Sequence, residues 1–253
     1  MLAELVPTEI FGFFLVFVRL GAALMLLPGI GERFIPVRIR LAVAIVLTLA
    51  IGPVVVDTLP PLPPQFLEMF LLLLSEMVIG VLIGGMARMA MAGLHVAGTL
   101  IAFQTSLGFA LFLDPTQGTQ GALVATFLNI LGLVLIFATD LHLLMIQGLA
   151  DSYILFVPGA LPQATELAQL ATQFVSGAFR IGVQIAAPFI VYGLVFYISL
   201  GILARLMPQF QVFFIALPLQ ILVGLTILAL VLPAAMMWFL NHFENNIALF
   251  LVR

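Results

Sequence analysis

Long apolar runs, separated by short polar or proline-rich breaks, follow one another along almost the whole chain. The runs cover residues 10–30, 41–56, 66–86, 93–113, 122–140, 166–204 and 210–240. Most reach the roughly 20 residues that a helix needs to cross the bilayer core, although the second is short for a span. They are too long for strands, and the alternation of a membrane-barrel strand is absent. The pattern predicts an all-α membrane protein with about six long apolar helices and leaves open a further helix over 140–156.

Proline and glycine interrupt these runs and predict kinked helical hairpins. The proline-rich stretch at residues 57–64 cannot be helix interior and is expected to be a stiff connector. Pro188 should kink the helix in which it lies, and the pair Gly80 and Gly84 predicts close helix packing. Breaks at membrane depth are typical of transport paths, but Gly and Pro are also common in ordinary membrane helices. Both readings stay open for the breaks at Pro28, Gly80, Gly84, Gly85, Gly108, Pro188 and Pro218.

Composition narrows the classes of function. The chain is 64% hydrophobic and 8% charged, whereas soluble domains are about half apolar and about a quarter charged. The net charge of −3 and the lack of a basic stripe argue against nucleic acid. There is no Cys, no HExxH, no Gly-rich phosphate loop and no G-x-S-x-G elbow. We therefore expect no enzyme, no catalytic residue, no bound metal and no cofactor.

Ionisable residues inside or beside apolar runs are candidates for buried ionic or structural roles. Arg19 and Glu76 lie within runs, Arg88 follows the third run, and Arg205 ends the long run that starts at residue 166. Such groups are costly in a membrane and face a partner or a cavity. Glu76 and Arg88 are about 18 Å apart along a straight helix, so they cannot pair with each other. Their partners must come from other segments or from other subunits.

The distribution of charges also predicts part of the topology. Arg33, Arg38 and Arg40 favour a cytoplasmic first loop. Asp57 then falls outside, Arg88 returns to the cytoplasmic side and Asp114 falls outside again, which is a consistent alternation.

A candidate gate lies between the fourth and fifth runs. Phe109 and Phe112 are about one helical turn apart and directly precede a polar turn. A hydrophobic constriction of this kind can close a pore by excluding water, and the alternative is lipid contact or core packing. The residues assigned to the candidate gate segment (residues 108–118) are Gly108, Phe109, Phe112, Asp114, Pro115, Gln117 and Gly118.

Several stretches together resemble the flagellar biosynthetic protein FliR family and the equivalent component of virulence type III secretion systems. Each stretch is weakly specific, but their order and spacing cover nearly the whole chain. They are Phe17-Val18-Arg19, Ile35-Pro36-Val37-Arg38-Ile39-Arg40, Glu76-Met77-Val78-Ile79-Gly80, Gly98-Thr99-Leu100-Ile101-Ala102-Phe103-Gln104, Asp114-Pro115-Thr116-Gln117-Gly118-Thr119-Gln120, Ala187-Pro188-Phe189 and Ala204-Arg205-Leu206-Met207-Pro208-Gln209-Phe210-Gln211-Val212-Phe213-Phe214.

The resemblance implies one integral-membrane subunit over residues 1–253. It implies a FliP-like part over about 1–160 and a FliQ-like helical hairpin over about 165–253. The subunit would co-assemble with FliP and FliQ into a helical export gate in the bacterial inner membrane, within the flagellar basal body. FlhB and FlhA would be further partners, and unfolded flagellar proteins would pass through. The resemblance also makes the loop around Gly108–Gln120, which contains the candidate gate segment, the plug, with hinges at Gly108 and Pro115.

Two alternatives remain at this stage. One is the homologous subunit of a virulence type III secretion system. The other is a secondary transporter of a small solute, which predicts an internal repeat with paired broken helices and a buried ionic cluster. No convincing inverted repeat is visible in the sequence.

Overall fold

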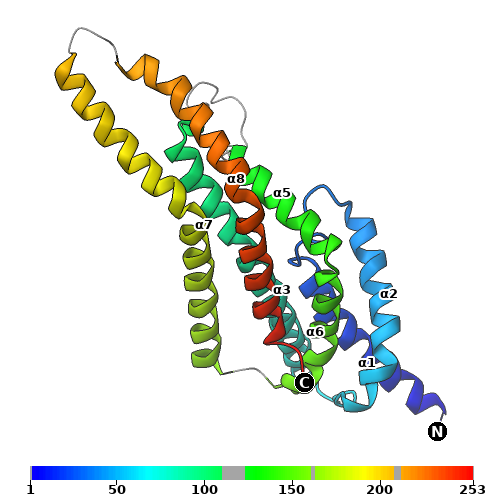
Figure 1. Ribbon diagram of the computed structural model, residues 1–253. Coiled ribbons are helices and arrows are strands. Elements are labelled where there is room, and N and C mark those ends of the chain that lie inside the picture. Colours follow the sequence, from blue (N-terminus) through cyan, green and yellow to red (C-terminus); the bar gives the residue numbers. More distant parts are fainter. Residues whose placement is uncertain (1, 110–122, 161–162, 208–211, 253) are drawn as a thin grey trace. The chain divides into compact units, whose positions relative to one another are not determined.

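The protein is all-α in every part that the structure describes (Figure 1). The computed structural model describes residues 2–109, 123–160, 163–207 and 212–252. The α-helices are α1 (Leu2–Leu24), α2 (Val37–Val55), α3 (Phe66–Gln104), α5 (Leu123–Ala138), α6 (Leu141–Leu155), α7 (Ala164–Leu206) and α8 (Val212–Ala248). Two short 3-10 helices, η1 (Val56–Thr58) and η2 (Leu107–Phe109), follow α2 and α3. The predicted all-α membrane class is confirmed.

Four of the described helices are long and apolar enough to cross a membrane, namely α2, α3, α7 and α8. A fifth span results if α5 and α6 are taken together across the break between them. Asp140 lies in this break and has a left-handed backbone with φ of 58°. The predicted count of about six is therefore approximate.

The third and fourth apolar runs form one helix instead of two. Helix α3 continues from Phe66 to Gln104 for 39 residues, which is about 58 Å along the axis. The stretch around Arg88 that suggested a boundary contains no proline, and arginine is a good helix former. A single charge therefore interrupts the hydropathy pattern without ending the helix.

The boundaries of the first two helices also differ from the apolar runs. Helix α1 ends at Leu24, before Gly29, whose φ of 91° suits a turn. Helix α2 begins at Val37, directly after its N-cap Pro36. Its 19 residues include Arg38 and Arg40, which the sequence pattern placed in the first loop, so α2 is long enough for a span. The proline-rich connector is not helical at residues 59–65, as predicted.

Helices α7 and α8 contain prolines and remain helical through them. Pro188 lies inside the 43 residues of α7, and Figure 1 shows this helix bending part-way along its length. Pro218 and Pro233 lie inside α8, which continues beyond the apolar run to Ala248. A proline removes one backbone hydrogen bond and bends a helix without necessarily ending it.

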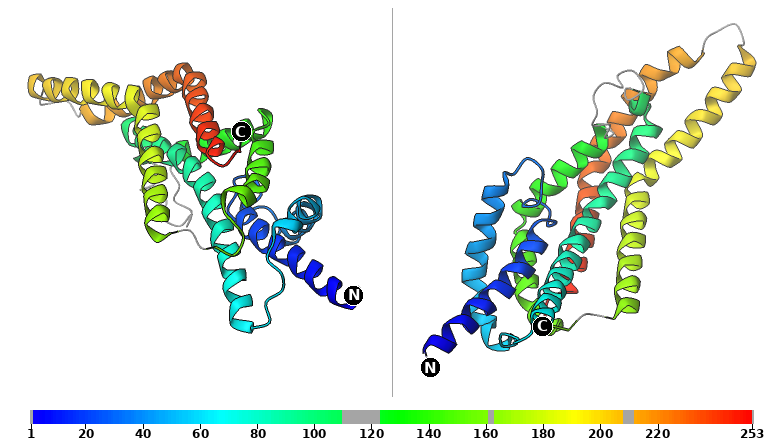
Figure 2. Two further views of the ribbon diagram at one scale, coloured as in Figure 1. Left: turned by 90° about the horizontal axis from the view of Figure 1, so that it is seen from below. Right: turned by 180° about the vertical axis from the view of Figure 1, so that it is seen from behind.

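The chain divides into two compact units, each built from separate stretches of sequence. Unit 1 comprises Met1–Ala90, Ile136–Phe174 and Phe243–Arg253, and unit 2 comprises Met91–Leu135 and Val175–His242. In unit 1, α1 and α2 pack side by side (Figure 2), and α2 also contacts α6. Apolar side chains such as Leu15, Leu20 and Ile79 form the core of unit 1, and Leu94, Leu128 and Phe239 that of unit 2.

Candidate functional site

A fully buried ion pair lies in the core of unit 1. The Nε of Arg19 on α1 is 2.6 Å from Oε2 of Glu76 on α3, and Nη2 of Arg19 is 3.1 Å from Oε1 of Glu76. Both side chains have no exposed surface. The guanidinium therefore meets the carboxylate in a two-point contact, the geometry for which arginine is suited.

The rest of the guanidinium is satisfied by α6 and the residues that follow it. Nη1 of Arg19 donates to the backbone oxygen of Ser152 at 3.1 Å and to Oγ of Ser152 at 3.3 Å. Nη2 also donates to the backbone oxygen of Phe156 at 3.3 Å, and the guanidinium carbon lies 4.1 Å from the centre of the Tyr153 ring. Glu76 Oε1 additionally accepts from the backbone N–H of Gly159 at 3.2 Å. The cluster thus joins α1, α3 and α6 inside unit 1.

All five N–H groups of Arg19 are used in this cluster. A buried pair whose donors and acceptors are all occupied has little capacity left for a substrate or a mobile ion. The geometry therefore favours a structural role for Glu76, as one partner of a buried ion pair. The partner of Glu76 is Arg19, from another segment of the same chain. The sequence alone had left open a partner from another subunit.

Two glycines allow α3 to approach α1 closely enough for this contact. A Cβ atom at Gly80 would collide with the backbone oxygen of Arg19, and one at Gly84 would collide with that of Ala23. The small-xxx-small pair predicted from the sequence is thus confirmed as a packing feature.

Arg88 and Arg205 lie on the surface of the described chain. The Arg88 side chain is 44% exposed, and its Nη1 is 3.4 Å from Oε1 of Glu32, in the loop between α1 and α2. Arg205 is exposed near the end of α7. Within one chain, neither has the buried environment that was expected, so their burial remains a prediction about an assembled complex.

A second buried polar group, here called the Gln220 clamp, closes the end of α3 in unit 2. It comprises the backbone oxygen of Gln104 and the side chains of Ser106, Tyr197 and Gln220. Gln220 on α8 is 2% exposed. Its Nε2 donates to the Gln104 oxygen at 2.7 Å and to Tyr197 Oη at 3.1 Å, and its Oε1 accepts from Ser106 Oγ at 2.7 Å.

The backbone at the clamp is unusual. Ser106 has a φ of 58°, a left-handed conformation that is uncommon for a residue other than glycine. It separates α3 from η2, which contains Gly108. Gln220 holds this turn from both sides, because it bonds Gln104 before the turn and Ser106 within it.

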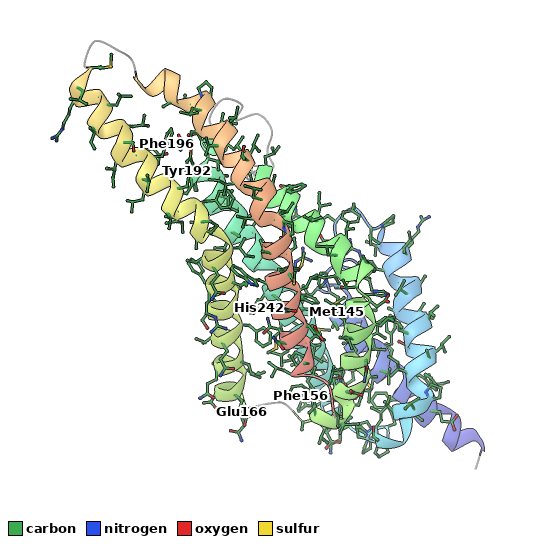
Figure 3. The ribbon with its side chains drawn as sticks, in the orientation of Figure 1. Met145, Phe156, Glu166, Tyr192, Phe196 and His242 are labelled. Atoms are coloured by element: carbon green, nitrogen blue, oxygen red, sulfur yellow. The ribbon has the colours of Figure 1, made fainter. Side chains whose placement is uncertain are left out.

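Small residues surround the clamp and let the helices of unit 2 pack tightly. A Cβ atom at Gly224 on α8 would run into Thr105, and one at Gly193 on α7 would run into the Gln104 side chain. Tyr197 neighbours an aromatic pair on α7, Tyr192 and Phe196, with ring centres 5.5 Å apart (Figure 3). The end of α3 is thus fixed between α7 and α8.

The clamp lies immediately before the candidate gate segment. Gly108 is buried within η2, and the backbone of Phe109 ends that short helix. Phe112, Asp114, Pro115, Gln117 and Gly118 lie outside the described residues. On the far side of the segment, α5 starts at Leu123, and Ala125 packs against Gly98 of α3 so closely that a Cβ atom on Gly98 would collide with its backbone. The helices that precede and follow this stretch, α3 and α5, are therefore firmly packed.

Sequence reasoning did not single out Ser106, Tyr197 or Gln220 for a site. Gln220 is the only glutamine between Val212 and Leu240 in α8, and this is a signal that could have identified it, since a polar side chain in an apolar helix needs a partner. The identity of that partner depends on the packing of three helices. In the part of the chain that the structure describes, no group of three or more His, Asp or Glu residues could hold a metal ion.

Comparison with known proteins decides the family. The profile of the bacterial export proteins, family 1, matches residues 10–246. The chain belongs to this family. Its match covers both the Arg19–Glu76 cluster and the Gln220 clamp of this export protein.

Relatives in several bacteria carry the same description. The export protein is 43% identical over 225 residues to the flagellar biosynthetic protein FliR of Caulobacter vibrioides, which covers 88% of this chain and 90% of that protein. It is 36% identical over 222 residues to the FliR of Pectobacterium carotovorum, covering 87% and 84% of the two chains. It is 30% identical over 217 residues to the FliR of Escherichia coli, covering 85% and 82%. The resemblance inferred from the sequence is confirmed.

Proposed function

We propose that this export protein is a core channel subunit of the flagellar type III protein export apparatus. It would act in the bacterial inner membrane, within the flagellar basal body, and help to form the gate through which unfolded flagellar proteins pass. The observation that carries the proposal is the family match over residues 10–246, together with relatives that are named flagellar biosynthetic protein FliR.

The helices support a role inside a larger assembly. Helices α3, α7 and α8 have 39, 43 and 37 residues, so each is about 55 to 65 Å long if straight, against about 30 Å for the bilayer core. In their most apolar windows only 17% to 28% of the positions are buried inside the chain. Lipid alone would cover only part of such length, and neighbouring subunits can cover the rest.

The proposed partners follow the family resemblance. The chain would co-assemble with FliP and FliQ and lie near FlhB and FlhA. Residues up to about 160 would act as the FliP-like part, and residues from about 165 as the FliQ-like hairpin. This role is structural and not enzymatic.

The segment 108–118 is proposed as the gate of the assembled channel. The Gln220 clamp and the packing of Gly98 on Ala125 support this, because they hold the helices that precede and follow the segment within unit 2. Replacing Phe109 and Phe112 together with Ala should raise ion leakage through the assembled complex, as an apolar constriction excludes water. Unchanged leakage would remove these two side chains from the seal.

Co-purification tests the proposal as a whole. The chain is expressed alone and together with FliP and FliQ, and both samples are extracted in mild detergent and sized. We expect the chain to aggregate by itself and to elute with its partners as one large particle. A stable monomer in the presence of FliP and FliQ would contradict the proposal.

A small-solute transporter is the alternative, and the ion pair of unit 1 weighs against it. Transport of an ion or solute requires a polar site that can be occupied and vacated. The Arg19–Glu76 cluster has its guanidinium donors already engaged by protein groups. A solute-binding monomer in the co-purification test would favour this alternative.

A further inference from the structure

The loop between α1 and α2 and the start of α2 carry a dense group of positive charges in unit 1. Arg33 and Arg38 are exposed, and Arg40 is half-buried. Arg88 of α3 lies beside the same loop, since its Nη1 is 3.4 Å from Oε1 of Glu32. We call these four arginines the basic group.

Carboxylates of the chain compensate this charge only in part. The four arginines and Glu32 together carry a net charge of +3, although the whole chain carries −3. Glu32 is the only acidic residue in the sequence from residue 10 to residue 56, and none occurs from residue 77 to residue 113. Among the described residues, Arg33 and Arg38 form no ion pair. Two guanidinium groups are therefore presented to whatever surrounds the chain.

Hydrogen bonds hold the loop that carries these charges in a defined shape. Nη2 of Arg40 donates to the backbone oxygens of Glu32 and Ile35, each at 2.9 Å. The backbone N–H of Gly31 donates to the oxygen of Leu27 at 2.8 Å, and Leu27 is buried. The inner side of the loop is thus anchored on unit 1. Arg40 is a positioning residue, because it ties the backbone of the loop to the start of α2.

Apolar side chains accompany the exposed arginines. Phe34 and Val37 are 72% and 65% exposed, and Ile45, Val46 and Leu49 are exposed further along α2. The 19 residues of α2 extend about 28 Å, which is close to the bilayer core of about 30 Å. Helices α3, α7 and α8 are much longer. If lipid covers the exposed side of α2, the arginines at its start lie at the level of the lipid headgroups.

We infer that the basic group, together with Phe34 and Val37, binds the headgroups of anionic phospholipids. The inference goes beyond the export role and rests only on the membrane character of the chain. A guanidinium can hold two phosphate oxygens in parallel hydrogen bonds. Groups of four or more basic residues beside a membrane-spanning helix attract anionic lipid, and neighbouring apolar side chains can enter the boundary between headgroups and acyl chains. An acidic protein surface would match the charge alone, whereas lipid also matches the apolar side chains and the length of α2.

Quenching of a fluorophore by spin-labelled lipid tests the inference, because the chain contains no Cys of its own. A fluorophore is attached to Ile39→Cys, beside the basic group, or to Val54→Cys at the other end of α2 as the matched control. Both positions are exposed. The complex with cysteine-free FliP and FliQ is placed in phosphatidylcholine nanodiscs. These contain a small fraction of spin-labelled phosphatidylglycerol or, in parallel, the same fraction of spin-labelled phosphatidylcholine.

Phosphatidylglycerol should be enriched at one end of α2 only. An arginine beside an anionic surface adds about a five-fold preference, which is about 1 kcal/mol. At position 39 we therefore expect phosphatidylglycerol to quench at least about five-fold more effectively than phosphatidylcholine. At position 54 the two lipids should quench equally. Raising the salt concentration should weaken the preference at position 39, because salt screens exposed charges.

Substitution of the two exposed arginines identifies the source of the preference. Arg33→Gln with Arg38→Gln should lower the preference at position 39 to about two-fold or less. Arg33→Lys with Arg38→Lys is the matched control, since it keeps both charges and should keep most of the preference.

Each other outcome overturns the inference. Equal quenching by the two lipids at position 39 would show lipid contact without selection of the headgroup. No quenching there by either lipid would show that a neighbouring subunit covers the basic group, and a preference that survives the glutamine variant would arise elsewhere. A chain recovered only as a monomer would contradict the proposed function, and the same measurement on that monomer would still test this inference.

Discussion

Arg19 and Glu76 show how a charge is accommodated in this apolar chain. Both are fully buried, and the guanidinium makes five hydrogen bonds to Glu76, Ser152 and Phe156. Removing one partner of a buried pair leaves the other as an uncompensated charge, and this loss exceeds the net contribution of the intact pair.

The variant Glu76→Gln should therefore destabilise the complex strongly. We expect a loss of about 3–5 kcal/mol, which would be measured as a lower thermal midpoint and a lower yield of the purified complex. Glu68→Gln is the control, because Glu68 is on the same helix and exposed. The double variant Arg19→Met with Glu76→Leu should be less unstable than Glu76→Gln, since no charge remains buried. A double variant as unstable as the single one would contradict this account.

The Gln220 clamp gives a second prediction at single-residue scale. In Gln220→Leu, the Gln104 oxygen loses its hydrogen bond from the side chain, and Ser106 and Tyr197 lose their partner. Unpaired buried groups cost about 1–3 kcal/mol. We expect a less stable complex and, because the clamp fixes the start of the segment 108–118, higher ion leakage through it.

Thr226→Val on the same helix is the matched control for this variant. Thr226 is exposed and bonds the backbone of its own helix at Leu222. If ion leakage through the complex rises equally in both variants, any change in α8 has this effect. The clamp would then have no specific role in keeping the channel closed.

At the scale of whole helices, stability depends on how closely the helices pack against one another. Gly80 lies where any Cβ atom would meet the backbone oxygen of Arg19, whereas a Cβ atom at Gly21 on α1 would meet no atom within 4 Å. The variant Gly80→Ala should therefore push α1 and α3 apart and lower stability by about 1–3 kcal/mol. Gly21→Ala should be neutral or slightly stabilising, as alanine favours helix. Thermal midpoints of the two variants check this, and equal midpoints would refute it.

At the same scale, the sequence identified helix interiors better than helix ends. The two runs that merge into α3 were separated only by a charge, which changes hydropathy and leaves backbone geometry unaffected. By contrast, the proline-rich connector was predicted correctly because proline acts on the backbone directly. The contact of Arg88 with Glu32 brings the first loop next to the middle of α3 within unit 1. Because α3 continues through Arg88 without a turn, the reversal of the chain that the charge alternation required at this point does not occur there.

The whole molecule leaves much of its apolar surface uncovered. Leu230 on α8 is 77% exposed in the single chain. If lipid or a partner covers this face, Leu230→Glu should place a charge in an apolar environment at a cost of about 2.5–3.5 kcal/mol. We expect a large fall in the amount of complex recovered from membranes. Gln65→Glu, at an exposed position just before α3, should leave recovery unchanged. Full recovery of the Leu230 variant would show that this face is open to water.

The sequence by itself determined the helical class, the membrane character and the family, because the length of an apolar run, its breaks and the order of motifs are local properties of the chain. It also identified Arg19 and Glu76 as residues in need of partners. Only the tertiary structure decided that they pair with each other across 57 positions, and that Gln220 binds Ser106 across 114. Such contacts depend on how closely whole helices approach, and this distance is set by glycines and side-chain volumes on several helices at once.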